Sequence, residues 1–397
     1  MNGDLTKDVR QKGGIFLTPR KARELLFEKL EEFGVSEPAS ILEPSCGTGE
    51  FLLDAHERWP EAHLTGVELN TAMFVSVREQ TAENPNVSLA NMDFLKWTSG
   101  TKFDIIIGNP PYFVLPASTT GSTMCTGRPN IYIEFLHKCL TEHLKTNGFL
   151  AFILPTSIYN CAYYQPMRNY IAANTVIHHV ETLDKPGFFD TAQDTTLLIL
   201  QNCTPTLTPS PFLWKAANET LYISPHAAKL TALTAGSTTL HQLGFQAITG
   251  SIVWNVVKEH LTEDVLNPES KLLIYARNIK NGALELDNLV GKEVKQRIVL
   301  PKPKPTLSGP VILVDRGFGN GFKFNSALIP ESVTDFYAEN HLNVILSVLP
   351  QSVETKATLV RIQNSFQDPR TGEFVRLFNG NGTVSATNLN TLIPVFM

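Results

Sequence analysis

The chain is 397 residues long, with 43% hydrophobic residues, 18% charged residues and a formal net charge of −5. This composition excludes a disordered protein, and the length is sufficient for two domains with separate cores. No run of about 18 uncharged apolar residues occurs and the polar N-terminal segment lacks the apolar core of a signal peptide, so we expect a cytoplasmic protein that does not enter membranes.

Apolar strand-like runs alternate with amphipathic helix-like stretches in the first half of the chain. Predicted strands cover 40–44, 63–69, 87–92, 103–109, 148–155, 176–183 and 195–201, and predicted helices cover 19–33, 50–59 and 131–145. Buried strands that alternate with helices indicate a doubly wound α/β fold with a mainly parallel sheet covered on both faces. The last two strands have no clear helix between them, which favours an antiparallel hairpin at the sheet edge.

A Pro- and Thr-rich segment separates two regions of the sequence. The stretch "CTPTLTPSP" (203–211) is the predicted linker between a catalytic domain (1–202) and a second domain (212–397). Short mixed runs with Gly, Asn and Pro turns indicate an α+β architecture for the second domain. Its segment 271–323 carries ten Lys or Arg residues and only four acidic ones, so it is either a surface for phosphate groups or an ordinary solvated surface.

A tight glycine turn lies between the first predicted strand and the next helix, in "ILEPSCGTGEFLL" (41–53). In a doubly wound sheet this turn lies at the ligand crevice, where Gly47 and Gly49 let the backbone approach a ligand closely. The dinucleotide-binding pattern is incomplete, because Leu52 stands where its third glycine would be. Glu43 and Pro44 precede the turn, which suits a cationic, amino-acid-like ligand; the structural alternative is a simple turn.

Polar residues follow the next strands at the same edge of the predicted sheet. Glu68 lies in "GVELN" (66–70) at a strand end, at the position where a carboxylate takes the ribose hydroxyls of a bound nucleoside. Asp93 follows another apolar run and is suited to accept a hydrogen bond from an adenine amino group, with Phe94 packed on the ring. Each acid alone is equally typical of a helix cap or turn. As a series that continues to Asn109, they favour a functional edge.

The stretch "DIIIGNPPYF" (104–113) is an apolar strand that ends at Asn109-Pro110-Pro111-Tyr112. Two consecutive prolines have no N–H to donate to a sheet, so the strand cannot continue. It therefore delivers an amide, a rigid turn and an aromatic ring to its carboxyl end. The structural alternative is a strand-end turn with a packed tyrosine, and the preceding acids favour the functional interpretation.

Together, "EPSCGTG" and "NPPY" resemble the N6-adenine DNA methyltransferases of restriction–modification systems, which are class I S-adenosylmethionine-dependent methyltransferases with a Rossmann-like fold. The order "GGIFLTPRKARELL", "LEPSCGTGEFL", "GVELN", "MDFL" and "GNPPY", followed by a long C-terminal region, resembles the γ arrangement. In that arrangement the target-recognition domain follows the catalytic domain. The resemblance covers about residues 13–202 and extends loosely over 248–255 and 273–282.

The resemblance implies S-adenosylmethionine as the cofactor and assigns its contacts. Thr18 and Pro19 would contact it from the start of the first helix. Its methionine part would be surrounded by Glu43, Pro44, Cys46, Gly47 and Gly49, its ribose bound by Glu68, and its adenine bound by Asp93 and Phe94.

The resemblance also implies a reaction at the exocyclic amine of adenine, a poor nucleophile whose lone pair is delocalised into the ring. The Asn109 side-chain oxygen and the Pro110 carbonyl would accept both amine hydrogens and localise that lone pair. Tyr112 would stack on a base swung out of the duplex, which is worth about 1–3 kcal/mol. A second aromatic residue would close the other side, Phe189 or, with weaker support, Phe188, and either is equally suited to a core.

Three other functions compete with this interpretation. Protein-glutamine N5 methyltransferases also use Asn-Pro-Pro-Tyr, but they tend to show an Asp-x-Gly-x-Gly turn where this chain has "EPSCGTG". An RNA adenine N6 methyltransferase would not ordinarily need so long a C-terminal region. A non-catalytic DNA-binding protein with a degenerate fold would not be expected to keep the whole catalytic set.

Double-stranded DNA is the expected partner, and we expect a monomer or dimer. The resemblance also suggests a cognate restriction endonuclease as a functional, not necessarily physical, partner. Candidate DNA contacts in the second domain are Arg277, Asn278, Lys280 and Arg316, in "YARNIKNG" and "VDRGFGNG". The five cysteines include no C-x-x-C pair, and no H-E-x-x-H, P-loop or G-x-S-x-G motif occurs. We therefore expect no metal and no disulfide framework.

Overall fold

The computed structural model describes residues 18–116, 123–127, 129–183, 194–205, 210–286, 295–317, 324–350, 352–379 and 383–397. The chain divides into two compact units, the first made of Met1–Trp214 with Leu221–Ala227 and the second of Lys215–Thr220 with Ala228–Met397. A short strand pair, β8 (Leu213–Lys215) and β9 (Leu221–Ile223), belongs to the first unit except for Lys215. The domain limits and the linker at 203–211 stay predictions.

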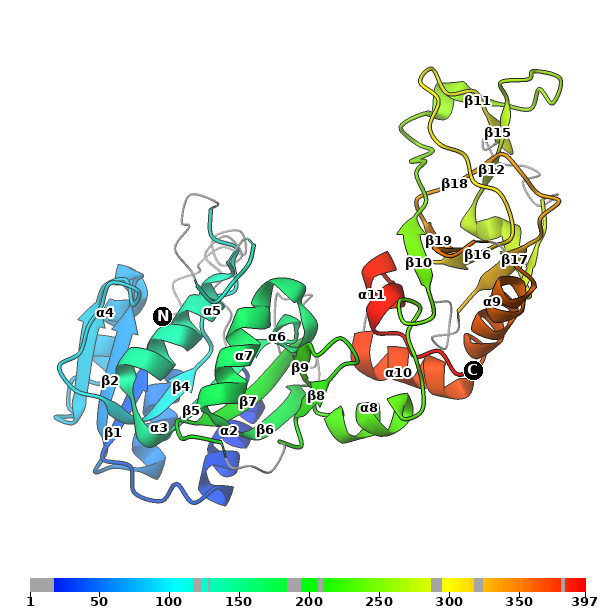
Figure 1. Cartoon of the computed structure of the whole chain (residues 1–397). Helices are drawn as coiled ribbons and strands as arrows, with labels where there is room; N and C mark the ends of the chain where they lie inside the picture. The colour runs from blue at the N-terminus through cyan, green and yellow to red at the C-terminus, as the bar shows by residue number, and fades with distance from the viewer. Residues whose placement is uncertain are drawn as a thin grey trace. The chain divides into compact units, whose positions relative to one another are not determined.

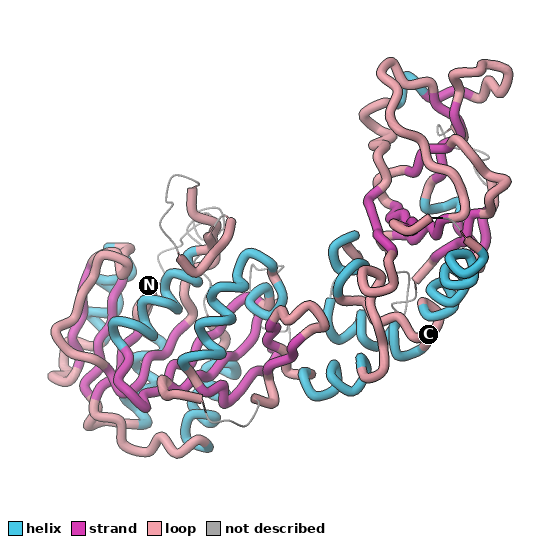
Figure 2. The backbone as a smooth tube through the Cα atoms, in the orientation of Figure 1, coloured by secondary structure: helices cyan, strands magenta, loops and turns pink. Residues whose placement is uncertain are grey.

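The first unit is built on a seven-stranded sheet with the order β3-β2-β1-β4-β5-β7-β6 (Figures 1 and 2). Its strands are β1 (Ser40–Glu43), β2 (His63–Glu68), β3 (Val87–Asn91), β4 (Phe103–Gly108), β5 (Leu144–Pro155), β6 (Val176–Leu183) and β7 (Thr195–Gln201). The strands from β3 to β5 pair in parallel, whereas β7 is antiparallel to both of its neighbours. The predicted doubly wound, mainly parallel sheet is confirmed. The predicted hairpin is also present, with β7 inside the sheet and β6 at its edge.

The helices of this unit are α2 (Arg20–Glu32), α3 (Glu50–Arg58), α4 (Thr71–Gln80), α5 (Ile131–Lys138), the π-helix η1 (Cys139–His143), α6 (Ser157–Asn160), the 3₁₀ helix η2 (Ala162–Tyr164) and α7 (Gln165–Asn174). The helix predicted at 131–145 is too long at its end. A π-turn finishes it at His143, and Leu144 already belongs to β5, where it pairs with Phe103.

Alternating side chains of the strands divide the core into two layers. Along β4, Ile105 and Ile107 pack into the layer that contains Leu26 of α2 and Leu52 of α3. Ile106 points into the other layer, with α5 and α7, which lie over the opposite face of the sheet (Figure 1). Because both faces are covered, β4 is apolar from Ile105 to Ile107. Its polar side chains lie at the two ends, Asp104 near its start and Asn109 just after it.

The second unit is α+β, as predicted. Its strands are β10 (Phe245–Thr249), β11 (Leu261–Thr262), β12 (Lys271–Ile274), β13 (Ile279–Lys280), β14 (Ala283–Leu284), β15 (Arg297–Ile298), β16 (Val311–Asp315), β17 (Ser326–Ile329), β18 (Phe336–Ala338) and β19 (Leu342–Ser347). Its helices are α8 (Ala227–Thr234), η3 (Lys258–His260), η4 (Ala276–Asn278), α9 (Val353–Ser365), α10 (Pro369–Asn379) and α11 (Ala386–Thr391).

Two four-stranded sheets organise this unit, an antiparallel one of order β10-β19-β16-β17 and a mixed one of order β11-β15-β12-β18. Leu313 and Val344 of the first sheet and Phe336 of the second pack in one core. Among the described residues of the whole chain, no helix is both long and apolar enough to cross a membrane.

Candidate functional site

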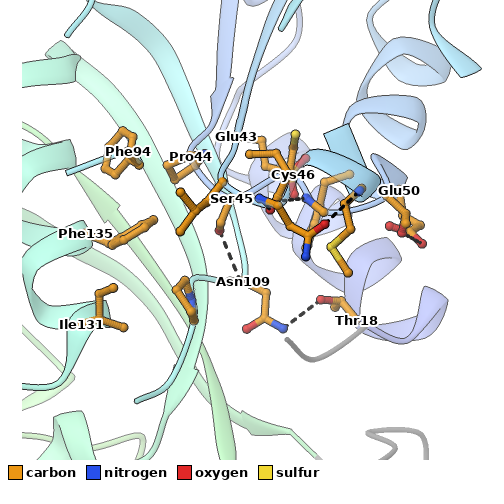
Figure 3. A pocket seen from close by; sticks show the side chains of 18 of the residues that line it. Thr18, Glu43, Pro44, Ser45, Cys46, Glu50, Phe94, Asn109, Ile131 and Phe135 are labelled. Carbon is orange, nitrogen blue, oxygen red and sulfur yellow. Dashed lines mark hydrogen bonds between the residues drawn. The ribbon is translucent and has the colours of Figure 1, made fainter. Parts of the chain in front are cut away.

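A cavity of about 300 Å³ lies at the carboxyl ends of β1, β2 and β4, a size within the range of small-molecule sites (Figure 3). Most of the residues predicted to bind the cofactor line it, together with the predicted catalytic amide. These residues are Thr18, Glu43, Pro44, Cys46, Gly47, Glu68, Asp93, Phe94 and Asn109. Four of the other predicted site residues, Pro19, Gly49, Pro110 and Tyr112, are described but do not line the cavity.

The two glycines of the turn after β1 have different tasks. Gly49 has φ +90°, and a Cβ on it would collide with Val77 Cγ2, so it permits close packing of the turn against α4. Gly47 has φ +54°, and a Cβ there would meet no atom within 4 Å. Both backbone conformations disfavour other residues. Gly47 belongs to the cavity wall, whereas Gly49 supports it from behind.

Glu68 at the end of β2 is held by backbone N–H groups. Gly47 N donates to one carboxylate oxygen at 2.8 Å and Asn70 N donates to the other at 2.7 Å. Burial raises the pKa of Glu68, and these N–H bonds offset part of that rise. Two bonds leave further lone pairs on the carboxylate for hydroxyl groups of a ligand.

Glu43 at the end of β1 is buried, with 3% of its surface exposed, and its Oε2 has no hydrogen-bond partner within the described parts of the chain. Burial, and then the nearby Glu50 and Glu68, raise the pKa of Glu43 well above its usual range. An unpartnered buried acceptor beside a cavity favours a ligand that brings a positive charge or a hydrogen-bond donor. The acid set therefore fits a cationic ligand that also carries hydroxyl groups.

Asp93 and Phe94 follow β3 and form the far end of the cavity. One Asp93 carboxylate oxygen accepts from Leu95 N at 2.9 Å, which fixes the turn, and the side chain remains 34% exposed. The Phe94 ring is 2% exposed and lies 4.8 Å from the Phe135 ring, centroid to centroid. Phe94 is thus core and cavity wall together, and it shares this wall with Phe135 (Figure 3).

Asn109 follows directly after β4 and joins this cavity to the start of α2. Its Nδ2 donates to Thr18 Oγ1 at 3.0 Å, and its backbone carbonyl accepts from Ser45 Oγ at 3.5 Å (Figure 3). Gly108 before it has φ +148°, a conformation that turns the chain at the end of the strand. Pro110 next to it is buried. The amide therefore reaches the same cavity as the acids of β1 and β2.

Tyr112 is buried in this structure, with 9% of its surface exposed. Its hydroxyl is in hydrogen-bond contact with Asn109 Oδ1 and donates to the Ile153 carbonyl oxygen at 2.7 Å. The ring packs edge-on against Tyr132, 6.2 Å away between centroids, and burial raises the pKa of Tyr112 well above its usual range. Stacking on a base therefore requires this ring to move. Phe189 and its alternative Phe188 lie outside the described residues.

Several cavity residues were not among the sequence predictions. Arg23, Ser45, Asn70, Met73, Met92, Phe113, Ile131 and Phe135 all line it. Arg23 carries no sequence signal, because an arginine on a charged helix face is ordinary. Asn70 does carry a sequence signal, because it closely follows Glu68 and asparagine is a preferred N-cap residue. In the structure it caps α4, with its side-chain oxygen accepting from Ala72 N and Met73 N.

Asn278 in the second unit is not a surface residue, so its prediction as a DNA contact is wrong for this structure. The side chain is fully buried. Its Oδ1 accepts from Tyr275 N at 2.9 Å, and its Nδ2 donates to the Glu285 carbonyl oxygen at 2.9 Å and to Gln296 Oε1 at 3.1 Å. The amide oxygen and nitrogen that would contact a base edge are thus both engaged inside the unit.

The other predicted DNA contacts are partly engaged within the second unit. The Arg277 guanidinium lies 5.4 Å from the Tyr275 ring centroid, and Lys280 lies 3.9 Å from a Glu285 carboxylate oxygen. Arg316 donates to the Asn340 carbonyl oxygen at 3.1 Å. Lys271, in the same basic segment, forms an ion pair with the carboxylate of Asp335. Much of the basic segment therefore serves the unit itself, and the DNA-binding roles of Arg277, Lys280 and Arg316 stay predictions.

Comparison with known proteins adds family information to this geometry. The family model described as Eco57I restriction-modification methylase matches residues 56–189. Type II methyltransferase M.CvrRI of Paramecium bursaria Chlorella virus XZ-6E is 32% identical over 394 residues, which cover 99% of this chain and 96% of that protein.

Two further relatives match shorter stretches. Modification methylase CviBIII of Paramecium bursaria Chlorella virus NC1A is 45% identical over 199 residues, 50% of this chain and 52% of that protein. The tRNA1(Val) (adenine(37)-N6)-methyltransferase of Vibrio cholerae serotype O1 (strain M66-2) is 30% identical over 125 residues, 30% of this chain and 51% of that protein.

Proposed function

We propose that this chain, which belongs to the type II methyltransferases of restriction–modification systems, methylates the N6 amine of adenine in double-stranded DNA. The observation that carries the proposal is the Asn109 amide in the wall of the same cavity as Glu43 and Glu68. A bound methyl donor and the target amine, which accepts the methyl group, would then be adjacent, as direct transfer between them requires.

The cofactor is S-adenosylmethionine, which supplies a methyl group activated on a positively charged sulfur when bound. Glu68 would accept hydrogen bonds from its ribose hydroxyls, since its carboxylate is held at a strand end by Gly47 and Asn70. Asp93 would accept from the adenine amino group. Glu43 would face the positively charged end, where its buried Oε2 has no hydrogen-bond partner among the described residues.

Asn109 and Pro110 would activate the target amine. The Asn109 Oδ1 and the Pro110 carbonyl oxygen would each accept one amine hydrogen, which draws the nitrogen toward tetrahedral geometry and localises its lone pair for attack. Preorganised acceptors of this kind act without a covalent enzyme intermediate. The rigid Pro110-Pro111 turn would keep the carbonyl direction fixed.

A base inside a duplex cannot reach this cavity edge, so we infer that the target adenine is flipped out. Tyr112 would then leave Ile153, release Asn109 Oδ1 and stack on the base. Phe189 remains the proposed second stacking residue, and Arg277, Lys280 and Arg316 remain proposed contacts to DNA.

DNA is favoured over RNA because M.CvrRI aligns with nearly the whole chain, the second unit included. The relative named for tRNA adenine N6 methylation aligns with 30% of the chain, so it supports the amine chemistry and not the target. A cognate restriction endonuclease acting on the same unmethylated sequence, and a location in the cytoplasm, belong to the same proposal.

The purified chain is incubated with methyl-labelled S-adenosylmethionine and genomic DNA from a host without N6-adenine methylation, with RNA and protein supplied in parallel. Digestion and mass spectrometry of the nucleosides should find the label on N6 of deoxyadenosine, and Asn109→Ala should give none. Label on cytosine would overturn the base assignment. Label confined to RNA or protein would overturn the DNA assignment.

A further inference from the structure

A chain of hydrogen bonds connects helix α3 with the Asn109 amide along one wall of the cavity. Arg23 on α2 donates from Nε to Asp54 Oδ2 on α3 at 2.5 Å, and from Nη1 to the Thr18 backbone carbonyl oxygen at 2.6 Å. Thr18 Oγ1 in turn accepts from Asn109 Nδ2 at 3.0 Å, the bond drawn in Figure 3. Three segments distant in sequence thus meet through one guanidinium and one threonine.

Arg23 differs from an ordinary helix arginine in its burial. Its side chain is 12% exposed and that of its partner Asp54 is 26% exposed. A guanidinium so far from water is retained where its N–H groups are paired, and charge-assisted bonds of this kind are strong and directional. Arg20, one turn earlier on α2, is 80% exposed and pairs only with Glu24, which is the usual surface arrangement.

Thr18 precedes helix α2, so the hydrogen bonds of the helix do not hold it in place. The N-cap of α2 is Pro19, which has no side chain able to cap, and the Pro19 carbonyl accepts from the N–H groups of Ala22 and Arg23. Thr18 is therefore fixed from the other direction, through its carbonyl and Arg23. The amide torsion of an asparagine is intrinsically broad, so a fixed hydroxyl next to Asn109 narrows the directions that its oxygen can take.

We propose that Thr18 and Arg23 are positioning residues that hold the Asn109 amide for methyl transfer, with Arg23 acting through the Thr18 carbonyl. The inference rests on the proposed function and extends it to the start of α2. The same helix start lines the cofactor cavity, since both Thr18 and Arg23 belong to its wall. A displacement of about 1 Å in such a group can cost about 100-fold in rate.

The test compares Thr18→Val, which keeps the shape of the side chain and removes the hydroxyl, with Thr18→Ser, which keeps the hydroxyl. Arg23→Lys keeps the charge and loses the planar fork. Arg20→Gln is the matched control on the exposed face of α2. Single-turnover methyl transfer to unmethylated genomic DNA is measured at saturating S-adenosylmethionine with the full chain, and cofactor Kd is measured by calorimetry.

We expect Thr18→Val and Arg23→Lys to lower the single-turnover rate about 10- to 100-fold, with Thr18→Ser and Arg20→Gln within about threefold of wild type. A wild-type rate in Thr18→Val, or a loss of the same size in Thr18→Ser or Arg20→Gln, would overturn the inference.

A second readout does not depend on turnover. In protein labelled with ¹⁵N-asparagine, the side-chain signal that is missing in Asn109→Ala identifies the Asn109 amide. This signal should shift toward that of a solvent-exposed amide in Thr18→Val and stay in place in Arg20→Gln; an unmoved signal in Thr18→Val would contradict the inference. A wild type that methylates no DNA would instead defeat the proposed function, while the amide signal would still decide whether Thr18 holds Asn109.

Discussion

The backbone N–H of Gly47 donates a hydrogen bond of 2.8 Å to the Glu68 carboxylate and so ties the glycine turn after β1 to the acid at the end of β2. The bond fixes the acid toward the cavity and uses one N–H that the turn would otherwise leave unpaired. Gly47 and Glu68 are 21 positions apart in sequence, and only the parallel pairing of β1 with β2 brings them together. The cofactor site is therefore built by sheet topology.

Glu68→Ala should weaken cofactor binding and leave the chemical step largely intact. Loss of hydrogen bonds to a charged group costs about 1.5–3 kcal/mol, which corresponds to a Kd for S-adenosylmethionine raised roughly 10- to 100-fold. Calorimetry measures the Kd, and kcat at saturating cofactor should stay within about threefold. Glu57→Gln, exposed on α3, is the control. An unchanged Kd for Glu68→Ala would remove this residue from the cofactor site.

Glu43→Gln should stabilise the cofactor-free protein more at alkaline than at acidic pH. Burial raises the pKa of Glu43 well above its usual range, and Glu50, Glu68, Asp54 and Arg23 are the charged groups around it. The native state therefore keeps the proton while the unfolded chain loses it near pH ~4.3, so wild-type stability falls as pH rises from there to the folded pKa.

Glutamine does not titrate, so the gain in Tm of Glu43→Gln over wild type should be larger at pH 8 than at pH 5. The same variant should bind S-adenosylmethionine more weakly at pH 8, because it lacks the negative charge. A Tm difference that is constant between the two pH values would mean that Glu43 is not held protonated in the free protein.

Tyr112→Phe and Tyr112→Ala should separate the hydroxyl of this residue from its ring. Phenylalanine loses the hydrogen bond to the Ile153 carbonyl and should cost about 1 kcal/mol of folding stability, with transfer to DNA within about threefold of wild type. Alanine also loses the stacking surface, worth about 1–3 kcal/mol, and should lower kcat/KM at least about tenfold. Equal kinetic losses in single-turnover assays of both variants would show that the hydroxyl, and not the ring, matters.

Asn278→Ala should destabilise the second unit by about 2 kcal/mol or more. The substitution leaves the Tyr275 N–H and the Glu285 carbonyl without their hydrogen-bond partner. Each unsatisfied buried group costs about 1–3 kcal/mol. Urea denaturation measures the loss, with Asn255→Ala at an exposed position as the control. If Asn278→Ala unfolded like wild type but changed the methylated DNA sequence, Asn278 would be a base-reading residue after all.

The sheet and much of the site were predictable from the sequence because both follow from strand ends. Glu43, Glu68, Asp93 and Asn109 each come directly after an apolar run, and parallel strands bring such ends to one edge. Local sequence patterns therefore predict which residues form this part of the cavity wall. The antiparallel β6–β7 pair was predictable in the same way, because the sequence between the two strands shows no clear helical pattern.

Features that depend on packing were not predictable. Arg23 looks like any helix arginine until its burial beside Thr18 is known. The ring of Tyr112 has two plausible places, the core or the cavity, and nothing local chooses between them. Asn278 stands in a polar, turn-like segment, yet a 3₁₀ turn folds its amide inward to cap the backbone at Tyr275.

The most direct test of the central claim is a map of modified bases in living cells. The wild-type chain and Asn109→Ala are expressed in a host without adenine methyltransferases, and the genomes are read by single-molecule sequencing. The wild type should place N6-methyladenine in one short sequence motif, and Asn109→Ala should leave the genome unmodified while still binding S-adenosylmethionine. An unmodified genome with soluble, cofactor-binding wild type, or full methylation by Asn109→Ala, would contradict the account.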